Sequence, residues 1–201
     1  MTDVFRTLSS PGKSSLREFG SKFLGFSFPV KNQDDIRRHL DDLRQAFPDA
    51  SHHCHAWMLG ISGALFRAWD DGEPNHSAGD PILGQIRSFG LTDVLVVVVR
   101  WFGGTKLGVS GLIQAYRQAA REALESATIA EVLVLERWKL EFPYLLMPTV
   151  MKAVKAAKSQ TISLTTAEPC VLVLEVPARA QFHLYLEQWR QSGVPVTFEA
   201  L

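Results

Sequence analysis

The chain has 201 residues and no formal net charge, with 21 lysine and arginine residues balanced by 21 aspartate and glutamate residues. This balance excludes a strong overall field for nucleic acid or anionic lipid, so any such binding must be local. With 46% hydrophobic and 21% charged residues, the sequence has globular proportions and should bury a core rather than stay disordered.

The ends and the cysteines of the chain indicate a cytoplasmic protein. Residues 1–10 lack an apolar run behind a basic start, and the longest apolar run, residues 94–99, is far shorter than the roughly 20 residues of a membrane span. Cys54 and Cys170 are too few for a disulfide framework and lack the spacing of a zinc or redox motif. We therefore expect free thiols, no membrane association, no metal and no cofactor.

The first part of the chain predicts a domain of strands and helices. Apolar alternation predicts one or two strands in residues 16–30, followed by an amphipathic helix that Asn32 caps and Pro48 ends. The following elements are expected to be strands at 52–61 and 64–69, a short helix at 81–89, a central strand at 91–99 and a helix capped by Ser110.

The second part predicts a smaller α+β domain. Its expected elements are strand 137–142, helix 144–158, strands 161–166 and 171–176, helix 178–191 and strand 194–198. This βαββαβ order is that of a ferredoxin-like split unit. The fold class is therefore α+β, with an N-terminal domain at 1–132 and a C-terminal domain at 133–201.

An acidic turn follows the second strand of the expected hairpin. Asp70, Asp71 and Glu73 lie within four positions, beside a glycine and a proline that favour a sharp turn. Such carboxylates could coordinate a hard cation or accept protons. The alternative is a solvated turn followed by a helix that Ser77 caps.

A glycine-rich segment lies between the central strand and the long helix. A strand followed by a glycine loop and a helix exposes backbone N–H groups that can cradle phosphate. It is not a Walker loop, because Val109 stands where the phosphate lysine should be. The alternative is a tight crossover that needs glycine for packing. The candidate phosphate or nucleic-acid contacts are Arg100, Gly103, Gly104, Lys106, Gly108, Ser110 and Tyr116.

The histidine-rich strand gives little support to zinc binding or nucleophilic catalysis. On a strand, His53 and His55 share one face, whereas His52 and Cys54 share the other, so at most two of them can reach one ion. There is no nucleophile-elbow motif in the sequence. We assign no catalytic residue, and the sequence favours a nonenzymatic protein.

Five segments together resemble the IMPACT/YigZ family of bacterial two-domain proteins. They are A-S-H-H-C-H-A-W at 50–57, D-D-G-E-P at 70–74, S-A-G-D-P-I-L at 77–83, V-V-R-W-F-G-G-T-K-L-G at 98–108 and G-L-I-Q-A-Y at 111–116. The resemblance covers essentially the whole chain and adds His52 and Cys54 to the signature positions. The sequence departs from the family pattern at His76, where glycine is usual, at Ser77, where threonine is usual, and at Ser110, where glycine is common.

The resemblance implies two folds that occur in the translation apparatus. The N-terminal domain should share the fold of a small-subunit ribosomal protein and of domain IV of elongation factor G, and the C-terminal domain should be similar to the last domain of that factor. We expect a nonenzymatic RNA- or ribosome-binding protein linked to translation, without DNA specificity.

Two alternatives stay open at the level of sequence. One is a divalent-metal-dependent enzyme acting on a phosphorylated or nucleotide ligand, and the other is a protein-docking module. The RNA-binding and the metal-enzyme hypotheses both depend on free charges. Both weaken if Asp70 or Glu73 forms a buried ion pair with Arg100 or Lys106, because those charges would then stabilise the fold.

Overall fold

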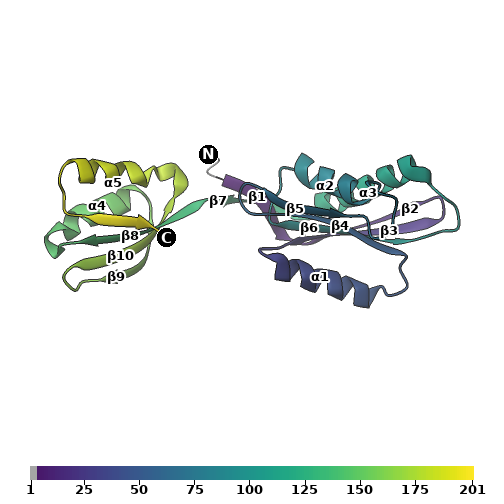
Figure 1. The fold of residues 1–201 in the computed structure, drawn as a ribbon, viewed down its shortest axis with the longest axis horizontal. Helices are drawn as coiled ribbons and strands as arrows, with labels where there is room; N and C mark the ends of the chain where they lie inside the picture. The colour runs from purple at the N-terminus through teal and green to yellow at the C-terminus, as the bar shows by residue number, and fades with distance from the viewer. Residues whose placement is uncertain (1–3) are drawn as a thin grey trace. The chain divides into compact units, whose positions relative to one another are not determined.

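The computed structural model describes residues 4–201 (Figure 1). The described chain divides into two compact units: Phe5–Val132 forms the first, and Leu133–Leu201 together with Val4 forms the second. Each unit contains an antiparallel sheet packed against helices, so the expected α+β class is confirmed. In the first unit, α1 lies on one face of the sheet, and α2 and α3 lie on the other (Figure 1). Within the described residues, no helix is both long and apolar enough to cross a bilayer.

The first unit is built on a five-stranded sheet in the order β2-β3-β6-β4-β5, with every neighbouring pair antiparallel. Its strands are β2 (Gly12–Glu18), β3 (Ser21–Pro29), β4 (His52–Leu59), β5 (Leu65–Trp69) and β6 (Val94–Trp101), and its helices are α1 (Gln33–Ala46), α2 (Gly79–Ser88) and α3 (Gly108–Glu125).

The central strand β6 separates two hydrophobic cores, because successive side chains of a strand point to opposite faces. Val94, Val96 and Val98 belong to the core beneath α2 and α3, whereas Leu95, Val97 and Val99 belong to the core beneath α1. The alternation places the next residue, Arg100, on the α2/α3 face. This placement determines the chemistry of the candidate site described below.

The start of α1 follows the predicted capping pattern. Asn32 Oδ1 accepts a hydrogen bond from the backbone N–H of Asp35 at 2.9 Å, and Asp35 Oδ2 accepts one from the N–H of Lys31 at 3.0 Å. These bonds satisfy donors that the first helical turn leaves free and place negative charge at the positive helix end. The predicted N-cap at Asn32 is confirmed.

A second sheet pairs β1 (Val4–Ser10) with β7 (Thr128–Leu133), and neither strand was predicted. Ser10 Oγ donates to Thr128 Oγ1 at 2.9 Å, and Ser9 Oγ donates to the Thr128 carbonyl oxygen. The side chains of both strands are mostly exposed or half-buried. They therefore lack the apolar alternation on which strand prediction depends.

The second unit contains a four-stranded antiparallel sheet in the order β11-β8-β10-β9. Helices α4 and α5 lie on one face of this sheet (Figure 1). Its elements follow one another as β8 (Leu135–Phe142), η1 (Tyr144–Leu146), α4 (Met147–Ala156), β9 (Gln160–Thr165), β10 (Cys170–Pro177), η2 (Ala178–Ala180), α5 (Phe182–Gln191) and β11 (Thr197–Ala200).

Burial of a histidine on β4 makes the stability of the first unit depend on pH. The His55 side chain lies on the α1 face and is buried, and burial lowers its pKa from the ordinary 6.5 to about 4. Burial also lowers the pKa of His53 and His39. Because protons then bind more tightly to the unfolded chain, stability present above pH 6.5 is lost as the pH falls towards 4.

We expect the free energy of unfolding to fall by about 2 kcal/mol between pH 6.5 and pH 4 on account of His55. Urea unfolding of the wild type and of His55→Leu at the two pH values measures this contribution. The variant should lose about 2 kcal/mol less than the wild type over this range. Equal losses in the two proteins would show that His55 is not the group responsible.

Candidate functional site

The acidic turn between β5 and α2 is a tight reverse turn. Asp71 and Gly72 have positive φ values of 46° and 87°, and the N–H of Glu73 donates to the carbonyl oxygen of Asp70 at 3.0 Å. Positive φ at both central residues is the pattern of a type I′ turn, for which an Asp-Gly pair is favoured. The turn leaves the Glu73 side chain almost fully buried, with 4% of it exposed.

The three acids of this turn do not form one cluster. Asp70 accepts hydrogen bonds from three backbone N–H groups at the start of α2, those of His76, Ala78 and Gly79, at 2.8 to 3.0 Å. Asp71 accepts one from the backbone N–H of His53 on β4 at 2.7 Å. Each carboxylate is therefore committed to a different part of the fold.

Ser77 does not cap α2, which corrects the alternative interpretation of this turn. Its Oγ donates to the Pro74 carbonyl oxygen at 2.6 Å, and Ala78 occupies the N-cap position without a side-chain capping bond. The Asp70 carboxylate takes the place of the expected serine cap, because it can accept from two successive N–H groups and also favours the positive helix end.

His76 occupies a backbone position that suits glycine. Its φ of 64° lies in the left-handed region, which residues with a Cβ atom adopt only at some cost. Its ring Nδ1 lies 2.6 Å from Asp80 Oδ2 and is exposed, so the histidine adds an ion pair at the surface when protonated. The departure from the usual glycine therefore changes the surface rather than the buried part of the site.

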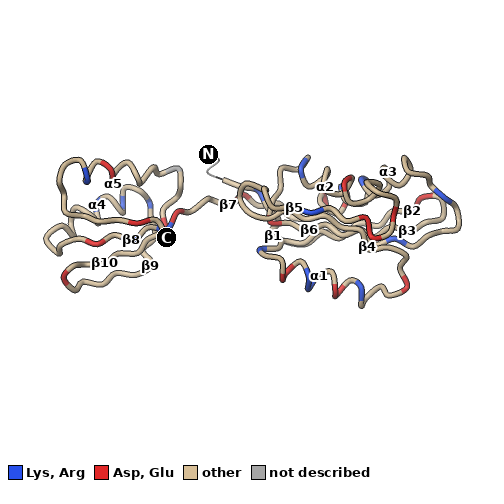
Figure 2. Tube along the Cα trace, viewed as in Figure 1, with Lys and Arg blue, Asp and Glu red and all other residues tan. Residues whose placement is uncertain are grey.

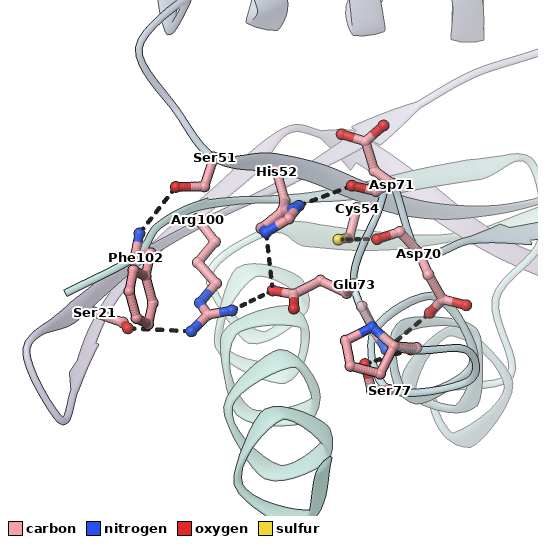
Figure 3. Close-up of polar contacts among 12 residues, drawn as sticks. Ser21, Ser51, His52, Cys54, Asp70, Asp71, Glu73, Ser77, Arg100 and Phe102 are labelled. Atoms are coloured by element: carbon pink, nitrogen blue, oxygen red, sulfur yellow. Dashed lines mark hydrogen bonds and ion pairs between the residues drawn. The ribbon is translucent and has the colours of Figure 1, made fainter. Parts of the chain in front are cut away.

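Glu73 and Arg100 form a buried ion pair between the acidic turn and the end of β6 (Figure 3). Glu73 Oε1 accepts hydrogen bonds from Arg100 Nη1 at 2.5 Å and from the Tyr116 hydroxyl at 2.8 Å. His52 Nε2 lies 3.8 Å from the same oxygen, while its Nδ1 lies 2.8 Å from the carbonyl oxygen of Asp71. One carboxylate thus connects β4, β6 and α3.

The Arg100 guanidinium is surrounded by the Glu73 carboxylate, a serine hydroxyl and two aromatic rings. Its Nη2 donates to Ser21 Oγ at 3.3 Å, and its carbon atom lies 5.4 Å from the Phe23 ring centroid and 5.6 Å from that of Phe102. Only 5% of the Arg100 side chain is exposed. The Arg100 guanidinium is therefore not exposed at the surface, where a phosphate contact was expected, and its charge already neutralises Glu73 inside the fold.

Tyr116 and Cys54 complete the buried network rather than offering reactive groups. Cys54 Sγ donates to the carbonyl oxygen of Asp70 at 2.9 Å and lies 3.3 Å from the Tyr116 hydroxyl. Burial raises the pKa of both groups well above the ordinary values, which keeps the thiol and the phenol protonated. Tyr116 is fully buried, and its hydroxyl donates to Glu73 inside the fold and is not at the surface, where a nucleic-acid contact was expected.

The glycine-rich segment that follows β6 in the sequence is exposed, in contrast to the buried network around Glu73. Gly104 and Gly108 have positive φ values of 87° and 69° with open space around them, and Lys106 is exposed. Helix α3 starts at Gly108 and Ser110 lies in its first turn, so Ser110 is not the predicted cap. Within the described part of the chain, Lys106 has no ion-pair partner.

Gly103 has a different role from the other two glycines of the loop. A Cβ atom there would lie 1.9 Å from the carbonyl carbon of Gly20, in the turn between β2 and β3. Its N–H donates to Ser21 Oγ at 3.2 Å, the same oxygen that Arg100 contacts. Here the packing interpretation of the glycine is correct, and the loop lies directly against the β2–β3 turn.

Sequence reasoning missed Ser21 and three basic residues on β2 and β3, namely Lys13, Arg17 and Lys22. The two cations of β2 are four positions apart, which places them on one face of a strand. That spacing was available in the sequence as a signal. The partner strand and its register were not, because only the folded sheet shows that Arg17 lies opposite Lys22.

Three comparisons place the chain among known proteins. The model of the Impact N-terminal domain matches residues 19–124. The chain is 40% identical over 125 residues to an IMPACT family member of Thermus thermophilus, covering 61% of this chain and 66% of that protein. It is 32% identical over 126 residues to YigZ of Escherichia coli, covering 62% of each.

The match to YvyE of Bacillus subtilis is 30% over 131 residues, or 65% of this chain and 60% of that protein. The matched part therefore spans less than two thirds of the length of each of these relatives. A crystal structure of a hypothetical protein superposes with a TM-score of 0.73 at 24% identity, covering 100% of this chain and 98% of the other, which shows a shared fold.

Proposed function

Because the chain belongs to the family defined by the Impact N-terminal domain, we propose that it is a nonenzymatic protein that binds RNA or the ribosome in the cytoplasm and acts in translation or its regulation. Two buried free cysteines are consistent with a reducing compartment. The observation that carries the proposal is the exposed loop between β6 and α3, with the unpaired Lys106 beside the start of an 18-residue helix.

The start of α3 is suited to meeting phosphate. It has no acidic residue in its first turn and no side chain that caps its N–H groups, so these donors and the positive end of the helix dipole stay free. Lys106 adds a full positive charge, and exposed Phe102 and Val109 flank the loop. Backbone N–H groups together with a lysine bind phosphate without reading sequence.

The fold of each unit, taken by itself, supports the same assignment. The strand order β11-β8-β10-β9 with helices on one face is that expected of a ferredoxin-like unit. We propose that this unit resembles the last domain of elongation factor G and that the first unit shares the fold of domain IV of that factor. This resemblance is an analogy at the level of fold, so the loop chemistry carries the functional argument.

The metal-dependent enzyme has no comparable support. Asp70 holds the start of α2, Asp71 binds the backbone of β4, and Glu73 neutralises Arg100, so the three acids do not converge on one point. Among the described residues, no group of three or more metal-binding side chains is arranged around a common site. Each of the three acids thus stabilises a different part of the fold.

A protein-docking role has one specific observation in its favour. Edge strand β5 exposes three large hydrophobic side chains, Leu65, Phe66 and Trp69, each between 45% and 51% exposed. Exposed apolar residues on a sheet edge are a recurrent feature of protein interfaces. Affinity capture from nuclease-treated lysate, with Phe66→Ser as the comparison, would test this role.

The RNA proposal is tested by Lys106→Ala. Affinity for a labelled single-stranded uridine 12-mer at 0.1 M salt should fall about fivefold, because one phosphate contact is lost. Fluorescence anisotropy measures the change. Lys31→Ala is the matched control, since Lys31 is exposed and follows Pro29, which pairs with Val94 at the other end of β6. Equal affinities for the two variants would exclude the loop as the contact.

A further inference from the structure

Edge strand β2 presents basic side chains on the face of the sheet opposite α3. Lys13, Ser15 and Arg17 alternate along the strand, and each is exposed. Side chains of β3 lie directly across from them on the same face. The pairs are Lys13 with Phe26, Ser15 with Leu24 and Arg17 with Lys22.

This face is only partly covered by α1. Helix α3 packs over β2 and β3 from the other side, whereas α1 packs chiefly on β4. The α1 segment reaches β3 through two ring contacts, His39 against Phe28 and Phe47 against Phe26. A hollow of about 470 Å³ remains, lined among others by Lys13, Ser15, Leu24, Phe26 and Phe47.

The cations of this face are not neutralised within the protein. Among the described residues, none forms an ion pair with Lys13, Arg17 or Lys22. Arg17 and Lys22 are directly opposite across the strands, where like charges repel each other. Asp49 borders this surface, where its carboxylate accepts a hydrogen bond from Trp101 Nε1 at 2.9 Å. A polyanion on this face would relieve the repulsion.

An apolar floor lies between the charges. Lys22 pairs with Trp101 on β6, and its Nζ lies 4.8 Å from the Trp101 ring centroid. Leu24 and Trp101 are partly buried against the core beneath α1, so each still presents apolar surface to solvent. Aromatic and aliphatic surface beside cations is the combination that binds bases and backbone of a single strand.

The basic face continues into the loop of the proposed RNA contact. The β2–β3 turn at Gly20 touches Gly103, and the Arg17–Lys22 pair is the second rung from that turn. From Arg17, the strand carries the next cation, Lys13, four residues or about 13 Å further on. Charge therefore extends from the loop along the edge strand, which suits an elongated ligand.

We propose that the open face of β2 and β3, defined by Lys13, Arg17, Lys22, Leu24 and Trp101, binds single-stranded RNA that extends from the glycine loop. The inference rests on the proposed RNA-binding function and adds a second surface to it. The Arg17–Lys22 pair meets phosphate near the loop, Lys13 meets phosphate further along the strand, and the Leu24–Trp101 floor meets bases. A duplex offers no unstacked bases and binds this floor less well.

The test compares two triple variants of the full chain that lose the same charge. Lys13→Gln/Arg17→Gln/Lys22→Gln removes the cations of the β2–β3 face. Lys31→Gln/Arg37→Gln/Arg38→Gln removes three exposed cations near the start of α1. Figure 2 shows both basic and acidic residues along this helix. Fluorescence anisotropy with the single-stranded uridine 12-mer is followed at several salt concentrations, and circular dichroism verifies folding. All substituted side chains are exposed or half-buried, and the double variant Lys13→Gln/Arg17→Gln spares the half-buried Lys22.

The strand-face triple variant should bind the 12-mer at least about tenfold more weakly at 0.1 M salt, and its salt slope should fall by about 2, whereas the control triple should stay near wild type. Equal weakening in both triples would overturn the proposal. Binding of polyphosphate, of a DNA 12-mer or of duplex RNA at least as tightly as the RNA 12-mer would overturn the assignment to single-stranded RNA.

These measurements test the loop and the strand face as RNA contacts independently of each other. Weakening by Lys106→Ala with an unaffected strand-face triple would leave the loop as the RNA contact and exclude the face. Weakening by the triple alone would retain the face and exclude the loop. A wild-type protein that binds none of the RNA probes would overturn both assignments.

Discussion

Replacing Glu73 by alanine should lower the free energy of unfolding by about 3 to 5 kcal/mol. The substitution leaves the Arg100 guanidinium buried without its counter-charge, and removal of one partner from a buried ion pair is costly in this range. It also removes the acceptor of the Tyr116 hydroxyl. Urea unfolding at pH 7, followed by circular dichroism, measures the loss.

An exposed ion pair of the same unit provides the matched control. Arg121 and Glu125 pair on α3 with about half of each side chain exposed, so Glu125→Ala should cost no more than about 0.5 kcal/mol. The double variant Glu73→Leu/Arg100→Met should be more stable than Glu73→Ala, because it removes both buried charges. A loss below about 1 kcal/mol for Glu73→Ala would contradict a stabilising role of the buried Glu73–Arg100 pair.

The stabilising role of the Glu73–Arg100 pair also changes how variants of the family's motif residues should be interpreted. A loss of RNA binding in an Arg100 variant would follow from unfolding around Ser21, Phe23 and Tyr116, since the guanidinium itself is inside the protein. Lys106 is the loop cation that reaches solvent. Functional tests of the loop should therefore avoid Arg100 and change Lys106.

Part of the site could be derived from the sequence and part could not. Alternation along β6 puts Arg100 on the same face as Val94, Val96 and Val98, so its burial follows from the strand once α3 is known to cover that face. The identity of its partner does not follow. Asp70, Asp71 and Glu73 are close in sequence, and only the positive φ values at the turn decide which of them points inward.

The fold, too, could be predicted from the sequence only in part. Strong periodicity gave the helices α1 and α3 and the buried strand β6, and their boundaries differ from the predicted ones by a few residues. Strands β1 and β7 were missed because their stability depends on pairing across more than 100 residues and on serine and threonine hydrogen bonds such as that from Ser10 to Thr128. Local pattern contains no signal for such pairing.

The loop should depend on Gly103 more than on any other glycine it contains. In Gly103→Ala the new Cβ atom would meet the Gly20 carbonyl carbon at 1.9 Å and the Ser21 nitrogen at 2.3 Å, and neither can move without separating the loop from the β2–β3 turn. We expect a loss of about 3 kcal/mol in the free energy of unfolding, at the upper end of the cost of overpacking.

A glycine in a helix supplies the comparison for this substitution. Gly84 is exposed in α2 with no atom near its would-be Cβ, so Gly84→Ala should raise stability by about 0.5 to 1 kcal/mol. Urea unfolding of both variants separates steric conflict from the general effect of an added methyl group. Unchanged stability in Gly103→Ala would mean that the turn and the loop are not locked together. If they are locked, movement of the turn displaces Ser21 from Arg100, and the same variant should weaken RNA binding through both the loop and the strand face.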